Sequence, residues 1–136
     1  MKADLPPCAR ILIEEFSKQG EQWNKESAAA RLSELLDDNP GLCFCLELEG
    51  EIIGLLFCEK FSYVKGTYLW LSEFAITSEH QGEGHGLEAL KFIDELAKKK
   101  GFNVLILAAN EKEKAFSFYQ KFGFEATNYR FMEKDV

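Results

Sequence analysis

The spacing of apolar residues changes twice along this chain. Near the N-terminus, the segments from about Leu5 to Lys18 and from around Ser27 to Asp37 repeat their apolar residues at helical intervals. The first segment opens with two prolines, which suit a first turn, and the second stops at Asn39-Pro40-Gly41. The pattern therefore predicts two amphipathic helices ahead of any strand.

A period of two follows these helices. Residues Leu42 to Leu48 and Ile52 to Lys60 alternate as strands do, and the intervening Glu49-Gly50-Glu51 predicts a hairpin. Tyr68 to Thr77 has the composition of a third strand, after a loop around Lys65-Gly66. These segments predict three consecutive antiparallel strands.

Helices and strands alternate in the second half of the chain. A helix is predicted from Leu87 to Lys99, and the wholly apolar Val104 to Ala108 predicts a strand buried on both faces. A last helix carries Ala115 to Phe122, and the tail from Glu125 to Met132 can form a last strand. The order predicts one α/β sandwich domain over residues 1–136, with a mixed, mostly antiparallel central sheet.

Composition narrows the class of protein. The chain has 136 residues, of which 46% are hydrophobic, so that one real core can form. A formal charge of −7 argues against a nucleic-acid partner, which needs basic patches. No apolar run approaches a membrane span and no signal peptide is evident, so we expect a cytoplasmic protein without a membrane partner.

The four cysteines do not show the spacing of a metal site. Cys43 and Cys45 lie in an apolar run, where strand alternation places both side chains on one face. Buried thiols are favoured over a zinc site, which would need a Cys-x-x-Cys pair and further ligands. The sequence therefore predicts reduced core cysteines and no metal.

The segment Gln81 to Leu87 is rich in glycine and lies between a strand and a helix. Its three glycines, Gly82, Gly84 and Gly86, allow positive φ angles and close approach of a ligand. Free N–H groups at the start of the following helix would bind a phosphate or diphosphate. The alternative is a glycine-rich turn that binds nothing.

Three ligand-binding motifs compete for this segment. A Walker loop fails because no lysine follows the glycines. A dinucleotide fingerprint can be read from Gly84 to Ala89, but the loop follows an antiparallel meander instead of opening a βαβ unit. The pattern Gln-x-x-Gly-x-Gly, at Gln81, Gly84 and Gly86, fits both position and context.

With these motifs the chain resembles the GNAT family of N-acetyltransferases. Ser72-Glu73-Phe74-Ala75-Ile76, followed by Ser78-Glu79-His80-Gln81, is similar to the family's strand that leads into its pyrophosphate loop. The segment from Ala115 to Phe124 is similar to the family's Ala-x-x-Phe-Tyr-x-Lys-x-Gly-Phe helix. The resemblance covers nearly the whole chain after Leu5, and its specific part runs from about Tyr68 to Phe124.

The resemblance implies that acetyl-CoA is the co-substrate. Its pyrophosphate would be held by the loop, and its pantetheine arm would pair with a strand that splays from the strand at Val104 to Ala108. A backbone N–H near Phe74 would polarise the thioester carbonyl. The implied cofactor-binding residues are Phe74, Ala75, Ile76, Gln81, Gly82, Glu83, Gly84, His85, Gly86, Leu87 and Asn110. Asn110 departs from the family's usual interval to the last helix, so Lys112 could occupy its place instead.

Two side chains carry the implied chemistry. Tyr119 lies where the family commonly places a tyrosine near the sulfur, which makes it the general acid; the alternative is a packed core aromatic. Glu73 would accept the amine proton or anchor a cation, and alternation sends it to the face opposite Phe74; the alternative is a solvated edge residue. Of the only two histidines, His85 is expected to lend its backbone N–H, and His80 to lie at the surface.

The acceptor implied by the resemblance is a primary amine on a small molecule or a peptide. The residues expected to line its pocket are Trp23, Phe61, Tyr63, Glu14 and Glu15, whose rings and carboxylates suit a cation; the alternative is that they are ordinary core and surface residues. A non-catalytic acyl-CoA-binding regulatory module is the alternative function, and a nucleotide-binding protein a more distant one. The family usually opens with a strand before its first helix, and this sequence reaches helical periodicity almost at once, so we expect the sheet either to lack that strand or to borrow one from a partner subunit. A missing first strand would expose a sheet edge and favour a homodimer.

Overall fold

In the computed structural model, which describes residues 5–136, helices and strands alternate much as their patterns predict. The elements are α1 (Leu5–Ser17), α2 (Lys25–Asp38), β1 (Cys43–Leu48), β2 (Glu51–Tyr63), β3 (Gly66–Ile76), the short 3-10 helix η2 (Ser78–His80), α3 (His85–Lys99), β4 (Val104–Ile106) and α4 (Lys114–Phe122). Helix α2 starts two residues earlier than predicted because Asn24 caps it: its Oδ1 accepts from Ser27 N at 2.8 Å, and Ser27 Oγ accepts from Asn24 N at 3.0 Å.

One four-stranded sheet, in the order β1-β2-β3-β4, forms the centre of the structure. Strands β1, β2 and β3 pair antiparallel, and β4 pairs parallel to β3, so the predicted mixed sheet is confirmed. The predicted hairpin between β1 and β2 turns at Glu49 and Gly50, whose φ angles are 51° and 84°. Two positive φ angles between paired strand ends are typical of a type I′ turn, which matches the twist of the strands.

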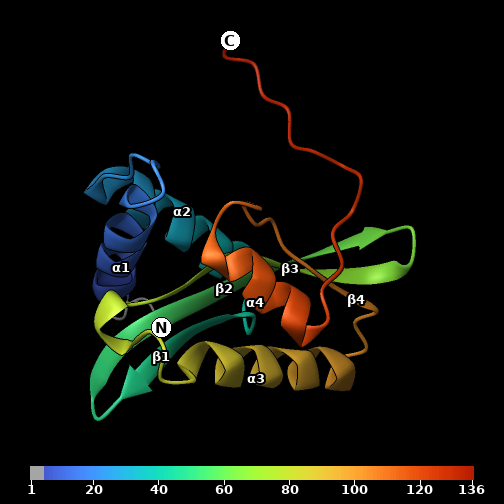
Figure 1. Cartoon of the computed structure of the whole chain (residues 1–136), viewed down its shortest axis with the longest axis horizontal. Helices are drawn as coiled ribbons and strands as arrows, with labels where there is room; N and C mark the ends of the chain where they lie inside the picture. The colour runs from blue at the N-terminus through green and yellow to red at the C-terminus, as the bar shows by residue number, and fades with distance from the viewer. Residues whose placement is uncertain (1–4) are drawn as a thin grey trace.

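Helices cover both faces of this sheet (Figure 1). Helices α1 and α2 lie on one face and share a core with Leu55 and Phe57 of β2. Helix α3 lies on the other face, where Leu90 and Ile93 pack with Leu69 of β3, and aromatic residues of α4 join them. The sheet therefore has two apolar faces, as an α/β sandwich requires.

The cysteines lie in the core, as their apolar setting predicts. Cys43 and Cys45 both pack on the α1 and α2 face, which confirms the alternation along β1. The sulfur atoms of Cys8 in α1 and Cys45 lie 2.9 Å apart, and burial raises the pKa of Cys43 to about 11. At that pKa, the Cys43 thiol keeps its proton at neutral pH.

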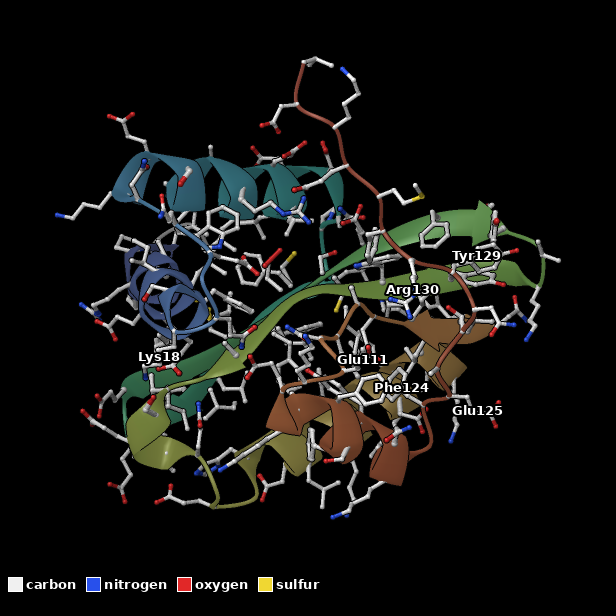
Figure 2. All side chains as sticks on the ribbon, turned by 45° about the horizontal axis from the view of Figure 1, so that its top comes forward. Lys18, Glu111, Phe124, Glu125, Tyr129 and Arg130 are labelled. Atoms are coloured by element: carbon white, nitrogen blue, oxygen red, sulfur yellow. The ribbon has the colours of Figure 1, made fainter. Side chains whose placement is uncertain are left out.

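The C-terminal part of the sheet differs from the prediction. Strand β4 ends at Ile106 and its residues are half-buried, whereas the sequence predicted a fully buried strand reaching Ala108. The predicted last strand from Glu125 to Met132 does not form, and this tail runs past β4, as Figures 1 and 2 show. Phe131 in the tail is 78% exposed. Because β4 has a strand neighbour only on its β3 side within the described residues, one of its edges stays open.

At the other edge of the sheet, β1 has no strand neighbour beyond β2 in residues 5–136. Helix α1 begins at Leu5, the first described residue, so the expected absence of a strand ahead of it falls on residues outside the described ones. None of the helices in that part is both long and apolar enough to span a membrane.

Candidate active site

Strands β3 and β4 separate soon after they meet. Their pairing covers only Tyr68 with Val104, Leu69 with Leu105, and Trp70 with Ile106. Beyond Trp70, β3 continues to Ile76 with β2 as its strand partner, while residues 107–110 leave the sheet. The segment 71–76 therefore has backbone groups on one side that face no strand of the described chain, and an extended ligand can pair with such a row. Phe74, Ala75 and Ile76, predicted to bind the cofactor, all lie in it.

The glycine-rich loop follows directly and leads into α3. Gly82 and Gly84 have φ angles of 79° and 89°, which only glycine adopts without strain. A Cβ at either position would meet no atom within 4 Å, so the loop surface is open there. Gly86 serves a different purpose: it lies inside the first turn of α3, where a Cβ would approach Phe118 Cζ of α4 to 3.4 Å.

The N-terminus of α3 has the features of an anion site. Gly84 occupies the N-cap position, and no side chain caps the helix. The first N–H groups of a helix have no partner within it, and the helix dipole adds positive charge at the same end. The loop and the unpaired segment of β3 adjoin each other along the chain, so a diphosphate and an extended arm can be held in sequence.

The exposed Gln81 uses its side-chain amide to bond within the protein. Its Nε2 donates to the carbonyl oxygen of Ile76 at 2.8 Å and to Glu15 Oε1 at 3.2 Å. The side chain thus fixes the turn between the end of β3 and the loop, and it leaves anion contacts to the backbone. This positioning of the loop is a role that the motif alone did not specify.

Glu15 is buried, which corrects its expected place in an acceptor pocket. Its carboxylate accepts hydrogen bonds from Ser78 N at 3.1 Å and from Ser78 Oγ at 3.0 Å, in addition to the bond from Gln81. Lys18, which directly follows the end of α1, pairs with Glu15 at 3.4 Å and also contacts Ser78 Oγ. Helix α1 is therefore tied to the turn that precedes the glycine-rich loop.

Tyr119 lies beside the segment where β3 and β4 separate. Its ring centroid is 6.4 Å from that of Phe74 and 5.8 Å from that of Phe124. Burial raises the pKa of the Tyr119 hydroxyl to about 12. The phenol therefore carries its proton throughout the neutral range and can act only as a donor to a developing negative charge.

Glu73 belongs to an ionic network on the opposite face of the sheet. Its Oε2 accepts from Arg31 Nε at 3.3 Å, and Arg31 Nη2 donates to Glu59 Oε2 at 3.4 Å. Ser72 Oγ donates to the same Glu59 oxygen at 2.6 Å. We call Arg31, Glu59, Ser72 and Glu73 the carboxylate network.

A β-bulge brings two consecutive residues into this network. Phe57 pairs with Glu73 and Cys58 pairs with Leu71, so Ser72 has no partner residue of its own. Ser72 and Glu73 can therefore both contact groups on the α2 face, where strict alternation would separate them. Phe74 packs on the α3 and α4 face, as alternation from Glu73 predicts.

Burial dominates the electrostatics of Glu73, whose side chain is 12% exposed. The pKa of Glu73 is raised chiefly by burial, and the Arg31 guanidinium lowers it by a smaller amount. A carboxyl group with a raised pKa is a stronger base than an ordinary glutamate once it is ionised. The arrangement can accept a proton or hold a cation on the α2 face.

The remaining predicted residues have diverse settings. Asn110 Oδ1 accepts from Lys112 N at 2.9 Å, so Asn110 shapes the loop before α4, and both residues are exposed. Trp23 donates to Glu21 Oε1 at 2.8 Å, and Tyr63 is 60% exposed. Phe61 lies within 6.1 Å of Trp70, measured between ring centroids, on the same projecting end of β2 and β3.

Sequence reasoning missed Arg31 and Glu59. Arg31 looks like one polar residue among many on α2, and only the sheet places it between two carboxylates. Glu59 carried a weak signal, as a charged residue in the predicted strand Ile52 to Lys60. Neither residue could be paired with Glu73 without the register of β2 and β3.

A shallow hollow lies elsewhere, beside the free edge of β1. Its apolar lining includes Phe44, Leu56 and Phe92, and His85 and Glu88 at the start of α3 border it. It adjoins the glycine-rich loop from the side away from the separation of β3 and β4. The candidate site is therefore formed by the glycine-rich loop and the segment where β3 and β4 separate, and not by this hollow.

Comparison with known proteins agrees with this geometry. The model of the acetyltransferase (GNAT) family matches residues 5–124. A predicted acetyltransferase with acetyl-CoA from Clostridium acetobutylicum has a similar structure, with a TM-score of 0.79, 16% identity, and coverage of 98% of this chain and 92% of that chain. A possible acetyltransferase from Clostridium difficile gives a TM-score of 0.83 at 14% identity, covering 100% and 93%.

An aminoglycoside acetyltransferase from an uncultured soil metagenomic sample gives a TM-score of 0.70 at 16% identity, covering 100% of this chain and 90% of that chain. No curated protein matches the sequence. The family model covers most of the chain, and the solved structures share the GNAT fold. The chain belongs to the GNAT family of acetyltransferases and is an N-acetyltransferase.

Proposed function

We propose that the chain moves the acetyl group of acetyl-CoA to a primary amine of a small molecule or a peptide, by direct attack in a ternary complex. The observation that carries this proposal is one continuous surface: the unpaired side of β3 at residues 71–76, followed by the uncapped N-terminus of α3. The similarity to a structure with acetyl-CoA supports the same co-substrate.

In this proposal, backbone groups make most of the contacts with acetyl-CoA. The N–H groups from Gly82 to Leu87 bind the diphosphate, and the positive φ angles of Gly82 and Gly84 aim them toward it. The backbone of Phe74, Ala75 and Ile76 pairs with the pantetheine arm in place of a strand. The N–H group near Phe74 stabilises negative charge on the carbonyl oxygen during attack.

The reaction forms a C–N bond to the acetyl carbon and breaks its C–S bond. Glu73 takes the proton that the attacking amine loses, directly or through water, which its raised pKa favours. Tyr119 donates a hydrogen bond to the sulfur as negative charge develops there, since its proton is retained at neutral pH. Bound acetyl-CoA supplies the activated acyl group.

The two side chains act from opposite faces of the sheet. Tyr119 packs against Phe74 on the α4 face, and Glu73 faces α2. In this proposal the thioester lies where β3 and β4 separate, and the amine reaches it from the α2 side. The acceptor amine therefore approaches through the α2 side, where the carboxylate network carries two glutamates and one arginine.

The same side offers rings and negative charge to an amine. Phe61 and Trp70 lie next to the network along β2 and β3, and Glu59 is 39% exposed at its edge. A protonated amine is attracted by aromatic faces and by carboxylates. The similarity to an aminoglycoside acetyltransferase supports an amine acceptor of this kind.

Acetyl-CoA titration by calorimetry, joined to an assay of CoA release over a panel of amines, tests the proposal. Gly84→Asp and Gly84→Asn form a matched pair, because both place a similar side chain at φ 89° and only one is charged. At about 4 Å a unit charge in water repels another by about 1 kcal/mol. A carboxylate facing a diphosphate with two charges therefore costs about 2 kcal/mol, and we expect the aspartate variant to bind acetyl-CoA roughly thirtyfold more weakly than the asparagine variant. Equal affinities would remove the loop from the diphosphate site.

The alternative that the sequence left open, a non-catalytic acyl-CoA-binding module, makes a different prediction for one contact. Arg31 already pairs with Glu73 at 3.3 Å, which holds the proposed base in an ion pair. Acetyl-CoA binding without amine-dependent CoA release over the whole panel would support the module.

The free edge of β1 is compatible with the homodimer that the sequence suggested, and light scattering measures the oligomeric state.

A further inference from the structure

Three side chains around the glycine-rich loop converge on one point. His80 ends η2, His85 begins α3, and Glu83 lies between them in the loop. Glu83 Oε1 is 3.0 Å from His80 Nδ1 and 3.1 Å from His85 Nε2. One donor atom from each residue lies within 4.8 Å of the other two.

These groups are the donors that borderline transition metals prefer. Imidazole nitrogen and carboxylate oxygen bind Zn²⁺ at about 2.0–2.2 Å, which in a tetrahedral site places the donor atoms roughly 3.3 Å apart. The two distances from Glu83 to the histidines are close to that separation. The two histidine nitrogens lie within 4.8 Å of each other, so they must come closer together when all three donors share one ion.

The backbone builds this arrangement before any ion arrives. Positive φ angles at Gly82 and Gly84 turn the chain on both sides of Glu83, so that its carboxylate returns between the two rings. The ring of His80 is 23% exposed and that of His85 is 19% exposed, while Glu83 is 50% exposed. The cluster is thus partly sheltered and still open to solvent, as a site that exchanges an ion requires.

We propose that His80 Nδ1, the Glu83 carboxylate and His85 Nε2 form a three-ligand site for Zn²⁺ or a related transition metal. This inference goes beyond the proposed acetyl transfer and does not depend on it. Water completes the coordination shell, because the three residues supply fewer ligands than a closed tetrahedral site holds. Mg²⁺ and Ca²⁺ bind poorly here, because they prefer an all-oxygen shell.

From the sequence we expected no metal, because the four cysteines lack the spacing of a metal site. The spacing His-x-x-Glu-x-His runs from a 3-10 helix through a loop into a helix, so no single periodicity brings the three side chains together. Only the folded turn makes them neighbours. The alternative to a metal site is a hydrogen-bonded cluster, in which both rings donate a proton to the same carboxylate oxygen.

Histidine NMR can test the site directly, since this chain has only two histidines and both are ligands. Untagged protein labelled with ¹⁵N is titrated with Zn²⁺ in the absence of acetyl-CoA, and long-range ¹H–¹⁵N spectra follow the ring nitrogens. We expect both rings to shift together and to saturate at one equivalent. The metal-induced shift should fall on Nδ1 of His80 and on Nε2 of His85. Shifts in one ring alone, or no saturable shift, would overturn the proposal.

Two variants and a second metal ion distinguish this site from binding at other acids or at the core cysteines. Glu83→Gln should raise the Zn²⁺ dissociation constant by about tenfold or more. Glu79→Gln removes an acid from the same short helix outside the cluster, and it should leave that constant unchanged. Co²⁺ bound here should show ligand-field bands without thiolate charge-transfer absorption, and such absorption would assign the ion to the core cysteines. Acetyl transfer is assayed separately with a chelator present, so failure of the metal site leaves the proposed function untouched.

Discussion

Replacement of Glu15 by alanine tests whether α1 holds the glycine-rich loop. The Glu15 carboxylate is 9% exposed and receives hydrogen bonds from Ser78 N, Ser78 Oγ and Gln81 Nε2. A hydrogen bond to a charged group contributes about 1.5–3 kcal/mol, and three bonds that share one acceptor do not add fully. We expect the free energy of unfolding to fall by about 3 kcal/mol, which lowers the melting temperature by about 10 °C.

The same substitution should weaken acetyl-CoA binding. Gln81 bonds both Glu15 and the carbonyl oxygen of Ile76, so its release loosens the end of β3 and the loop together. Ordering a loosened loop on binding costs conformational entropy, and we expect an affinity loss of roughly tenfold, equivalent to the ordering of about one backbone residue. Urea unfolding followed by circular dichroism measures the stability, and calorimetry measures the affinity.

Glu14→Ala is the matched control, because Glu14 is the neighbouring glutamate of α1 and is exposed. It should change stability by less than about 0.5 kcal/mol, as surface substitutions usually do. Glu15→Gln should fall between the two, since an amide oxygen still accepts while the amide N–H₂ faces other donors. If Glu15→Ala is no more destabilising than Glu14→Ala, the buried carboxylate does not anchor the loop, and our account of Gln81 is wrong as well.

Four further predictions address the chemistry and the sheet. Glu73→Gln should lower kcat at least tenfold, because the variant has no carboxylate to accept the amine proton. It should not lower stability at pH 7, because the raised pKa of Glu73 means that the folded state disfavours its charged form. Marked destabilisation would show that the ion pair with Arg31 outweighs the cost of burial. Tyr119→Phe should lower kcat about 100-fold with an unchanged KM for acetyl-CoA and an unchanged melting temperature, and equal turnover would reduce Tyr119 to a packing residue. In the pH profile of the wild type, activity should rise with pH as Glu73 ionises above its raised pKa. Because the pKa of Tyr119 is about 12, its ionisation should cause no loss of activity up to about pH 10. A Tyr119-dependent loss of activity near neutral pH would contradict this prediction. Gly54→Ala should lower the free energy of unfolding by about 1–3 kcal/mol and weaken acetyl-CoA binding, because its Cβ would lie 2.8 Å from the carbonyl oxygen of Ala75. Thermal unfolding and calorimetry measure these two effects. Wild-type values in both would show that β3 can shift to make room for the methyl group.

Local signals predicted most of the elements. The hairpin at Glu49 and Gly50 follows from two residues that tolerate positive φ between alternating strands, and such turn chemistry needs no distant contact. The prediction of a last strand was wrong because a strand depends on contacts with distant residues. Residues 125–132 have strand-like composition, but a strand forms only where it can bury side chains and pair an edge, and the tail keeps Phe131 and Met132 at 78% and 94% exposure.

In the candidate site, too, local motifs revealed some residues and the tertiary structure revealed the others. Gly82, Gly84 and Tyr119 were identified from motifs, because the loop and the helix that carry them are each encoded in a short stretch of sequence. Arg31 and Glu59 were missed because their relation to Glu73 depends on the packing of α2 over the sheet and on the register of β2 with β3. A bulge at Ser72 completes that network, and a bulge depends on strand pairing that local sequence leaves undefined.

By itself, then, the sequence determined most of the order of helices and strands, the place of the glycine-rich loop and the family, since periodicity, glycine conformation and helix ends are local properties. Only the tertiary structure decided where β3 and β4 separate, which carboxylate Arg31 pairs with, that Glu15 anchors the loop, and that His80, Glu83 and His85 meet. These relations join residues on different elements. Packing of the helices on the sheet, and the turning of the loop at its glycines, are what bring them within bonding distance.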